Sequence, residues 1–183
     1  MATAKTGSFY LTETIELPAA SLDGTRIVGS VDLGAYVNVA TGQAVAVEEV
    51  DFVTQQGTLF SQNPATLLAA SGTISFQVTD LNPGAAFVRA DNQSLIASGA
   101  LAIDATANVV SHQTDLYPDN FGPTAVSEAF MVVNDTMYLQ AGVDGAAVGA
   151  LPLFVTARIK ARIVKLSSKD WMAIAIQSTA SDN

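Results

Sequence analysis

Apolar and polar residues alternate along most of this 183-residue chain, and that period constrains its fold more than any other feature. In the first such stretch, Phe9, Leu11, Ile15 and Leu17 all lie at odd-numbered positions, while most of the residues between them are polar. Successive side chains of a β-strand point to opposite faces, so the pattern predicts a strand with one buried face. The same pattern predicts further strands at residues 27–39, 44–54, 73–79, 87–90, 95–103, 107–114, 130–133, 136–139, 154–166 and 171–177.

Three local signals interrupt the alternation. The phase changes around Glu48-Glu49, as it does where one extra residue forms a β-bulge. Asn134-Asp135 separates two predicted strands and tolerates the positive φ of a tight hairpin. Residues 63–72 begin with an Asn-Pro pair, continue with alanines and leucines and end on a glycine, which predicts a two-turn helical insertion.

Residues 1–183 are expected to form one domain with short flexible ends at 1–6 and 178–183, because no linker or internal repeat divides the chain. Apolar residues make up 49% of the sequence, enough for a core without disulfide bonds or a structural metal. The chain has no cysteine, which excludes disulfide scaffolds, zinc ribbons and thiol nucleophiles. Many short strands separated by turn signals predict an antiparallel β-sandwich, either a single jelly roll of about eight strands or an immunoglobulin-like fold.

The chain carries 17 acidic and 8 basic residues, for a net charge of −9. That balance repels a phosphate backbone, so nucleic acid is not an expected partner. Few lysines and a negative charge also suggest a salt-loving source. The N-terminal residues lack the apolar stretch of a signal peptide, and no apolar run is long enough to span a bilayer. We therefore expect synthesis and folding in a cytosol.

The bases are concentrated near the C-terminus, where residues 151–183 hold five of the eight. On the predicted strand 154–166, Arg158, Lys160 and Arg162 project to one face, and Lys165 and Lys169 follow them. One interpretation is an edge strand that charge protects against aggregation. The other is a docking surface for an acidic neighbour, a like subunit or anionic lipid headgroups, where each base contributes on the order of 1 kcal/mol. The two interpretations are compatible.

A histidine with neighbouring carboxylates can act as a base or a metal ligand, and His112 precedes Asp115 and Asp119. A single histidine cannot build the multi-histidine site of cupin-type jelly-roll enzymes. The Pro-Asp-Asn sequence that follows is typical of a surface loop. We therefore favour a surface loop over a catalytic site.

Glu48, Glu49 and Asp51 could supply oxygen ligands to calcium or the paired carboxylates of a glycosidase. On an extended strand Glu49 and Asp51 share one face and Glu48 points to the other, so only two of the three can converge. Solvation of an edge or a bulge is the interpretation that we favour. The sequence thus predicts no catalytic residue, no cofactor and no metal.

The segment Thr6–Leu17, TGSFYLTETIEL, enters directly into a predicted strand of an acidic, lysine-poor, all-β chain. These features resemble the smaller major capsid proteins of haloarchaeal icosahedral viruses that contain an internal membrane. The resemblance implies a vertical single jelly roll, whose strands stand roughly perpendicular to the shell. It also implies a second, larger jelly-roll capsid protein as partner, capsomers over a lipid vesicle, assembly in the host cytoplasm and no catalytic residues.

Three functions follow from these observations. The one that we expect is a structural subunit of a virion capsid, because a stable sandwich without catalytic residues suits a shell that needs surfaces more than sites. The alternative is a carbohydrate- or calcium-binding β-sandwich module. The third is an enzyme that uses His112 with Asp115.

Overall fold

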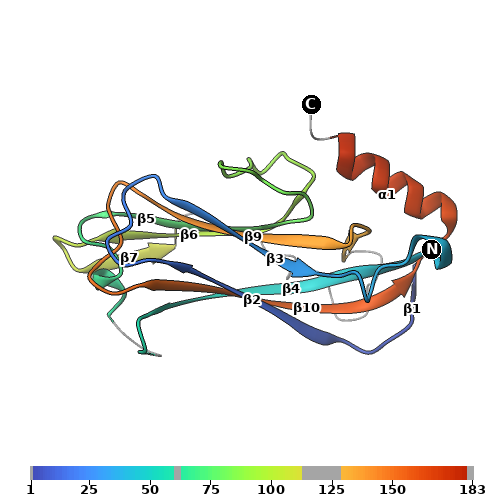
Figure 1. Cartoon of the computed structure of the whole chain (residues 1–183), viewed down its shortest axis with the longest axis horizontal. Coiled ribbons are helices and arrows are strands. Elements are labelled where there is room, and N and C mark those ends of the chain that lie inside the picture. The colour runs from blue at the N-terminus through green and yellow to red at the C-terminus, as the bar shows by residue number, and fades with distance from the viewer. Residues whose placement is uncertain (1, 60–62, 113–128, 181–183) are drawn as a thin grey trace.

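A computed structural model describes residues 2–59, 63–112 and 129–180, which form two antiparallel sheets that face each other along a common long axis (Figure 1). Sheet A contains β1 (Thr3–Ala4), β2 (Phe9–Leu17), β4 (Gln43–Gln56), β8 (Phe130–Val132) and β10 (Leu153–Lys165). Sheet B contains β3 (Arg26–Asp32), β5 (Gly72–Thr79), β6 (Leu95–Asp104), β7 (Val109–His112) and β9 (Thr136–Asp144). Two 3₁₀ turns, η1 (Val39–Thr41) and η2 (Pro64–Thr66), and the helix α1 (Ser168–Ala180) complete the elements.

The strands are connected as a jelly roll. Sheet A has the order β2-β10-β4-β8, and sheet B has the order β3-β9-β5-β6. From β2 to β5 and again from β7 to β10, each connection crosses from one sheet to the other, which is the double Greek key of a jelly roll. The predicted antiparallel jelly roll is therefore confirmed, and the immunoglobulin-like alternative is wrong. Two short strands lie outside this order: β1 pairs with the end of β10, and β7 extends sheet B beyond β6.

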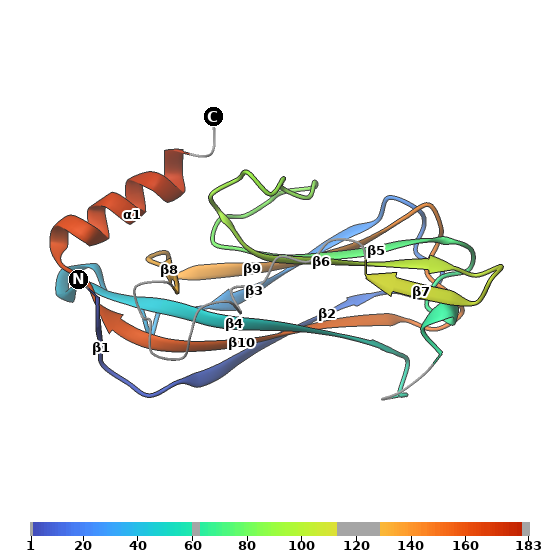
Figure 2. The ribbon, with the colours of Figure 1, turned by 180° about the vertical axis from the view of Figure 1, so that it is seen from behind.

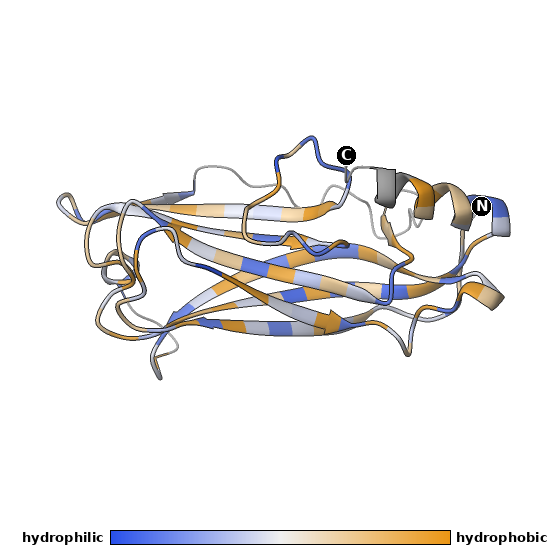
Figure 3. Cartoon of the chain, turned by 45° about the horizontal axis from the view of Figure 1, so that its top comes forward, coloured by the Kyte–Doolittle hydropathy of each residue, from blue (hydrophilic) through white to orange (hydrophobic). Residues whose placement is uncertain are grey.

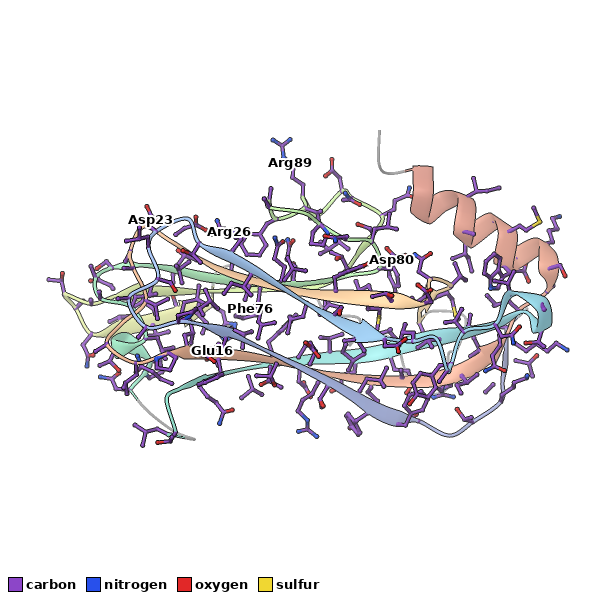
Figure 4. All side chains as sticks on the ribbon, in the orientation of Figure 1. Glu16, Asp23, Arg26, Phe76, Asp80 and Arg89 are labelled. Atoms are coloured by element: carbon purple, nitrogen blue, oxygen red, sulfur yellow. The ribbon has the colours of Figure 1, made fainter. Side chains whose placement is uncertain are left out.

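The core lies between the two sheets and is built by the apolar residues of each alternating strand, whose pattern Figure 3 shows along the ribbon. Phe76 of β5 is 2% exposed and packs on Phe52 of β4, with ring centroids 4.5 Å apart. Figure 4 places Phe76 between the sheets. Full burial of a side chain of this size stabilises the fold by roughly 1.5–3 kcal/mol, so each strand contributes through its inward residues.

The predicted β-bulge in β4 is confirmed. Lys160 of β10 pairs with Glu49, whereas the next residue, Ala161, pairs with Val47, so Glu48 is the extra residue. The insertion turns Val47 into the core and sends Ala46 and Ala44, which precede it in β4, to the outer face of sheet A. One residue thus changes which face of β4 is buried.

The strands predicted at residues 9–17, 44–54, 73–79, 95–103 and 154–166 are confirmed to within two residues at each end. The predicted strand at 87–90 is wrong, because this segment is a loop over sheet B. The Gln77 side chain donates to the carbonyl of Val88 at 2.8 Å and accepts from its amide at 2.9 Å, which replaces strand pairing. The predicted strand at 107–114 begins at Val109, and its last two residues lie outside the described residues.

Two predicted connections differ from the structure. Asn134-Asp135 does not form a hairpin, because it carries the chain from β8 in sheet A to β9 in sheet B, where Asn134 Nδ2 donates to the carbonyl of Asp80. The predicted continuation of the second strand to residue 39 is also wrong. The chain turns after Asp32, and Asn38 caps η1 by accepting a hydrogen bond from the amide of Thr41.

The helical insertion is confirmed, but it is a single 3₁₀ turn capped by Asn63 rather than two α-helical turns. It ends early because Leu68 forms a β-bridge with Val148. The strand predicted at 171–177 is wrong: residues 168–180 form α1, and the amide of Asp170 donates to Ser167 Oγ at its start.

Candidate interaction surfaces

The basic ladder of Arg158, Lys160 and Arg162 lies on the outer face of sheet A, opposite the apolar residues of β10, as the alternation predicted. β10 is a central strand, because it pairs with β2 along one side and with β4 along the other. The edge-strand interpretation of the ladder is therefore wrong. These bases do not protect an open strand edge.

Acidic residues of β4 stand beside the ladder. Lys160 Nζ lies 3.6 Å from Glu49 Oε2, and the Arg162 guanidinium forms an ion pair with Glu48. Asp51 is the register partner of Arg158 on the same face. Of these pairs, the more exposed one, Lys160–Glu49, contributes about 0–1 kcal/mol. The pairs nevertheless balance the charge of this face, so the ladder by itself presents little net positive charge to a partner.

Arg158 also lies over an aromatic ring, since its guanidinium carbon is 5.2 Å from the centroid of Tyr10 on β2. The contact spans the β2–β10 pair. Arg158 is exposed, whereas the other two ladder residues, Lys160 and Arg162, are half-buried. A cation over a ring contributes about 0.5–1 kcal/mol at an exposed site. The outer face of sheet A is thus a network of matched contacts.

The two remaining bases of the predicted interaction surface lie at one end of the long axis, here called the C-terminal pole. Lys165 is the last residue of β10 and Lys169 lies in the first turn of α1. Lys5 is nearby in the fold, because its amide donates to the carbonyl of Ile163 and its Nζ donates to Gln43 Oε1. All three lysines are exposed, and no ion pair connects them to the described part of the chain.

Helix α1 covers a second, smaller core at this pole. Trp171, Ile174 and Ala175 pack against an apolar cluster on the outer side of sheet A, formed by Ala44, Ala46, Val133, Val164 and Leu166. Met172 and Ile176, on the other side of the helix, are 60% and 63% exposed. Figures 1 and 2 show α1 projecting from the pole with its C-terminal end away from the strands. Sequence reasoning missed this helix, although residues 171, 174 and 175 have helical spacing.

The outer face of sheet B carries the loop 81–94, anchored at one side by Arg26. The Arg26 guanidinium makes bidentate contacts of 2.6 and 2.7 Å with Asp144 and lies 4.6 Å from the ring centroid of Phe87 in the loop. Figure 4 shows Arg26 and Asp23 near the pole opposite α1. Between the loop and the sheet is a groove of about 340 Å³, whose hydroxyl-bearing lining residues are Thr73, Ser75 and Ser98.

The candidate catalytic residues do not form a site among the described residues. His112 ends β7 in an exposed position, and Asp115 and Asp119 lie outside the described residues. Glu48 and Glu49 serve as counterions of β10. Within residues 2–59, 63–112 and 129–180, no group of three or more histidines and carboxylates is arranged to hold a metal ion.

Asp104 and Glu13 are two of the carboxyl groups whose pKa values are shifted. Backbone amides of Ala107 and Thr106, together with Ser71, hold the pKa of Asp104 below its ordinary value, because they donate to the carboxylate. Burial raises the pKa of Glu13, which lies against Gly29 where β2 approaches β3. Neither group belongs to a cluster that suggests catalysis. Both pKa shifts result from local structure.

None of the helices in the described ranges has the length and apolar character required to span a bilayer.

No protein-family model matches the chain, and no curated protein matches its sequence. Among solved structures, the chain is similar to Merkel cell polyomavirus VP1 in an unassembled pentamer, with 9% identity, a TM-score of 0.40, and coverage of 88% of this chain and 98% of VP1. A Desmodium yellow mottle tymovirus chain gives 9% identity, a TM-score of 0.32, and coverage of 90% and 93%. A chain of turnip yellow mosaic virus gives 8%, 0.34, 87% and 95%. The assignment of the jelly roll rests on the strand order above.

Proposed function

We propose that the chain is a structural subunit of a viral capsid, a major capsid protein without enzymatic activity. The observation that carries the proposal is the complete jelly-roll strand order, in which both sheets close on one core and leave their outer faces for contacts. The proposal assigns no catalytic role to His112. A shell subunit needs complementary surfaces, and the described surfaces of this chain are built from ion pairs, exposed apolar residues and one projecting helix.

In this proposal the subunit stands with its strands roughly perpendicular to the shell, and it assembles with itself and with a second, larger jelly-roll capsid protein in the host cytoplasm. The shell surrounds the internal membrane of a haloarchaeal virus. The elongated sandwich and the resemblance of Thr6–Leu17 and of the acidic composition to that virus family support this geometry.

The proposed contact surface comprises Arg158, Lys160, Arg162, Lys165 and Lys169, which would meet an acidic subunit or anionic lipid. Lys165 and Lys169 are its most available members, because the ladder residues already have acidic neighbours on β4. Attraction to a partner of opposite charge falls with ionic strength. The lysines of the C-terminal pole therefore supply the salt-sensitive part of the contact.

Sedimentation velocity of the purified chain, in molar and in low salt and with its co-purifying partner where one is present, tests the proposal. We expect discrete oligomers larger than a monomer in at least one of these conditions. A chain that stays strictly monomeric throughout contradicts the capsid role.

A second candidate function is a sugar-binding module, and the groove under loop 81–94 favours it. Hydroxyl groups of Thr73, Ser75 and Ser98 line one side, and Phe87 lines the other. A volume of about 340 Å³ lies within the range of small-ligand sites. A thermal shift on addition of a sugar, which is lost in a Ser75→Leu variant, would support this function.

A further inference from the structure

Helix α1 is apolar on two opposite sides. One side packs on the second core through Trp171, Ile174 and Ala175, whereas Met172 and Ile176 face solvent with 60% and 63% of their surface exposed. A helix that carries large apolar residues on two sides is normally buried on both. In a single copy of the chain, the side of α1 that carries Met172 and Ile176 is exposed to solvent.

The base of α1 is basic although the chain as a whole has a net charge of −9. Lys165 and Lys169 flank the start of the helix, and neither forms an ion pair with a described residue. Lysines that form no ion pair attract an acidic surface. A second copy of this chain presents such a surface, because residues 1–150 contain only three of the eight bases.

Suitable carboxylates lie near α1, because Asp135 is two residues from Val133 of the second core, and its carbonyl accepts a hydrogen bond from the amide that follows Asp32. Asp32 ends β3 and Asp135 precedes β9, and the register that pairs Asp32 with Thr136 brings these two exposed residues close together. Neither forms an ion pair with a base in the parts of the chain that the structure describes. The pole that carries α1 thus offers both the basic and the acidic residues needed for contact with the same pole of a second copy.

We propose that α1 docks on a second copy of the chain, with Met172 and Ile176 packed against that copy and with Lys165 and Lys169 beside Asp32 and Asp135 of the partner subunit. The inference rests on the proposed shell function, since it names the surface through which copies meet. A bilayer is the less suitable occupant, because a helix that lies in a membrane interface has a strongly polar face opposite its apolar one. In α1 the opposite face is apolar and already packed.

The apolar part of the contact is tested by the double variant Met172→Glu with Ile176→Glu, measured by sedimentation velocity over a concentration series. We expect self-association to weaken by about tenfold or more, as for central apolar residues of an interface. Leu22→Glu is the matched control, because Leu22 is 75% exposed in the loop at the opposite pole. Its self-association should equal that of the wild type.

A charge swap tests the identity of the partner. One variant carries Lys165→Glu with Lys169→Glu, and the other carries Asp32→Lys with Asp135→Lys. Each alone should associate less than the wild type, and an equimolar mixture of the two should regain association. Arg89→Glu controls for net charge, because Figure 4 shows Arg89 pointing away from the body on loop 81–94. Thermal unfolding of each variant verifies that it is folded.

Four outcomes contradict the inference in whole or in part. If the glutamate variants and the lysine variant all associate as the wild type does, the inference is overturned while the proposed capsid function stands. A strictly monomeric wild type overturns both the inference and the proposed function. A mixture that regains nothing removes Asp32 and Asp135 as the partners. Loss of binding to phosphatidylglycerol vesicles in the Lys165→Glu, Lys169→Glu variant, with unchanged self-association, assigns the pole to lipid.

Discussion

The carboxylate of Glu48 pairs with the guanidinium of Arg162, although the two residues are not register partners. Arg162 lies opposite Ala46, and Glu48 reaches it because it is the extra residue of the bulge in β4. Ser8 also donates to Glu48, at 2.7 Å. The bulge therefore places the Glu48 carboxylate beside Arg162 of the ladder. The same bulge turns Val47 into the core.

Removal of this anion should destabilise the fold. The side chains of Arg162 and Glu48 are only 17% and 13% exposed, so Glu48→Ala removes an anion from beside a largely buried cation. We expect a loss of about 2 kcal/mol in the free energy of unfolding. Glu49→Ala is the matched control, because its pair with Lys160 is more exposed, and it should cost less than about 0.5–1 kcal/mol. Equal losses in urea unfolding of the two variants would contradict this account.

Gly142 on β9 has no room for a side chain. A Cβ at this position would lie 2.5 Å from the carbonyl oxygen of Thr25 and would displace Arg26 from its place beside Asp144. Gly142→Ala should therefore lower the free energy of unfolding by roughly 1–3 kcal/mol. At Gly7 a Cβ would meet nothing within 4 Å, so Gly7→Ala should be nearly neutral. A thermal midpoint for Gly142→Ala equal to that of Gly7→Ala would count against the packing described here.

The stability contribution of Glu13 should depend on pH. Burial raises its pKa above 4.5 in the folded state, so just above pH 4.5 the folded chain keeps a proton that the unfolded chain loses. The free energy of unfolding therefore falls as pH rises from 4.5 through the folded-state pKa. Glu13→Gln removes this dependence and should be more stable than the wild type at pH 7. The measurement is urea unfolding of the wild type and Glu13→Gln from pH 4 to 8. A difference in the free energy of unfolding that is the same at every pH would refute the prediction.

Gln77 should control access to loop 81–94. Gln77→Met removes both hydrogen bonds that hold Val88 and leaves the side-chain volume nearly unchanged. We expect faster trypsin cleavage after Arg89, because proteolysis follows local opening. Gln55→Met, on β4 in sheet A, is the control and should leave this cleavage rate unchanged. Identical digestion of the two variants and the wild type would show that Gln77 does not anchor the loop.

The alternation was sufficient to predict several strands of the sandwich to within two residues, and also the bulge, because both depend on which residues face the core. It failed at residues 171–177, where consecutive apolar residues fit either a strand or a buried helix. It also failed at 87–90, where a side chain from another strand replaces the backbone ladder. The position of β10 within its sheet could not be predicted, since its partners β2 and β4 are distant in sequence. The acidic neighbours of the ladder were missed for the same reason.

Electron microscopy of the native material that contains this chain, in molar and in low salt, tests the proposed capsid function most directly. The account predicts icosahedral particles or free capsomers, with the sandwich axis roughly perpendicular to the shell and the C-terminal pole in contact with another copy. Small featureless particles in both salt conditions would contradict it and would favour the binding-module function.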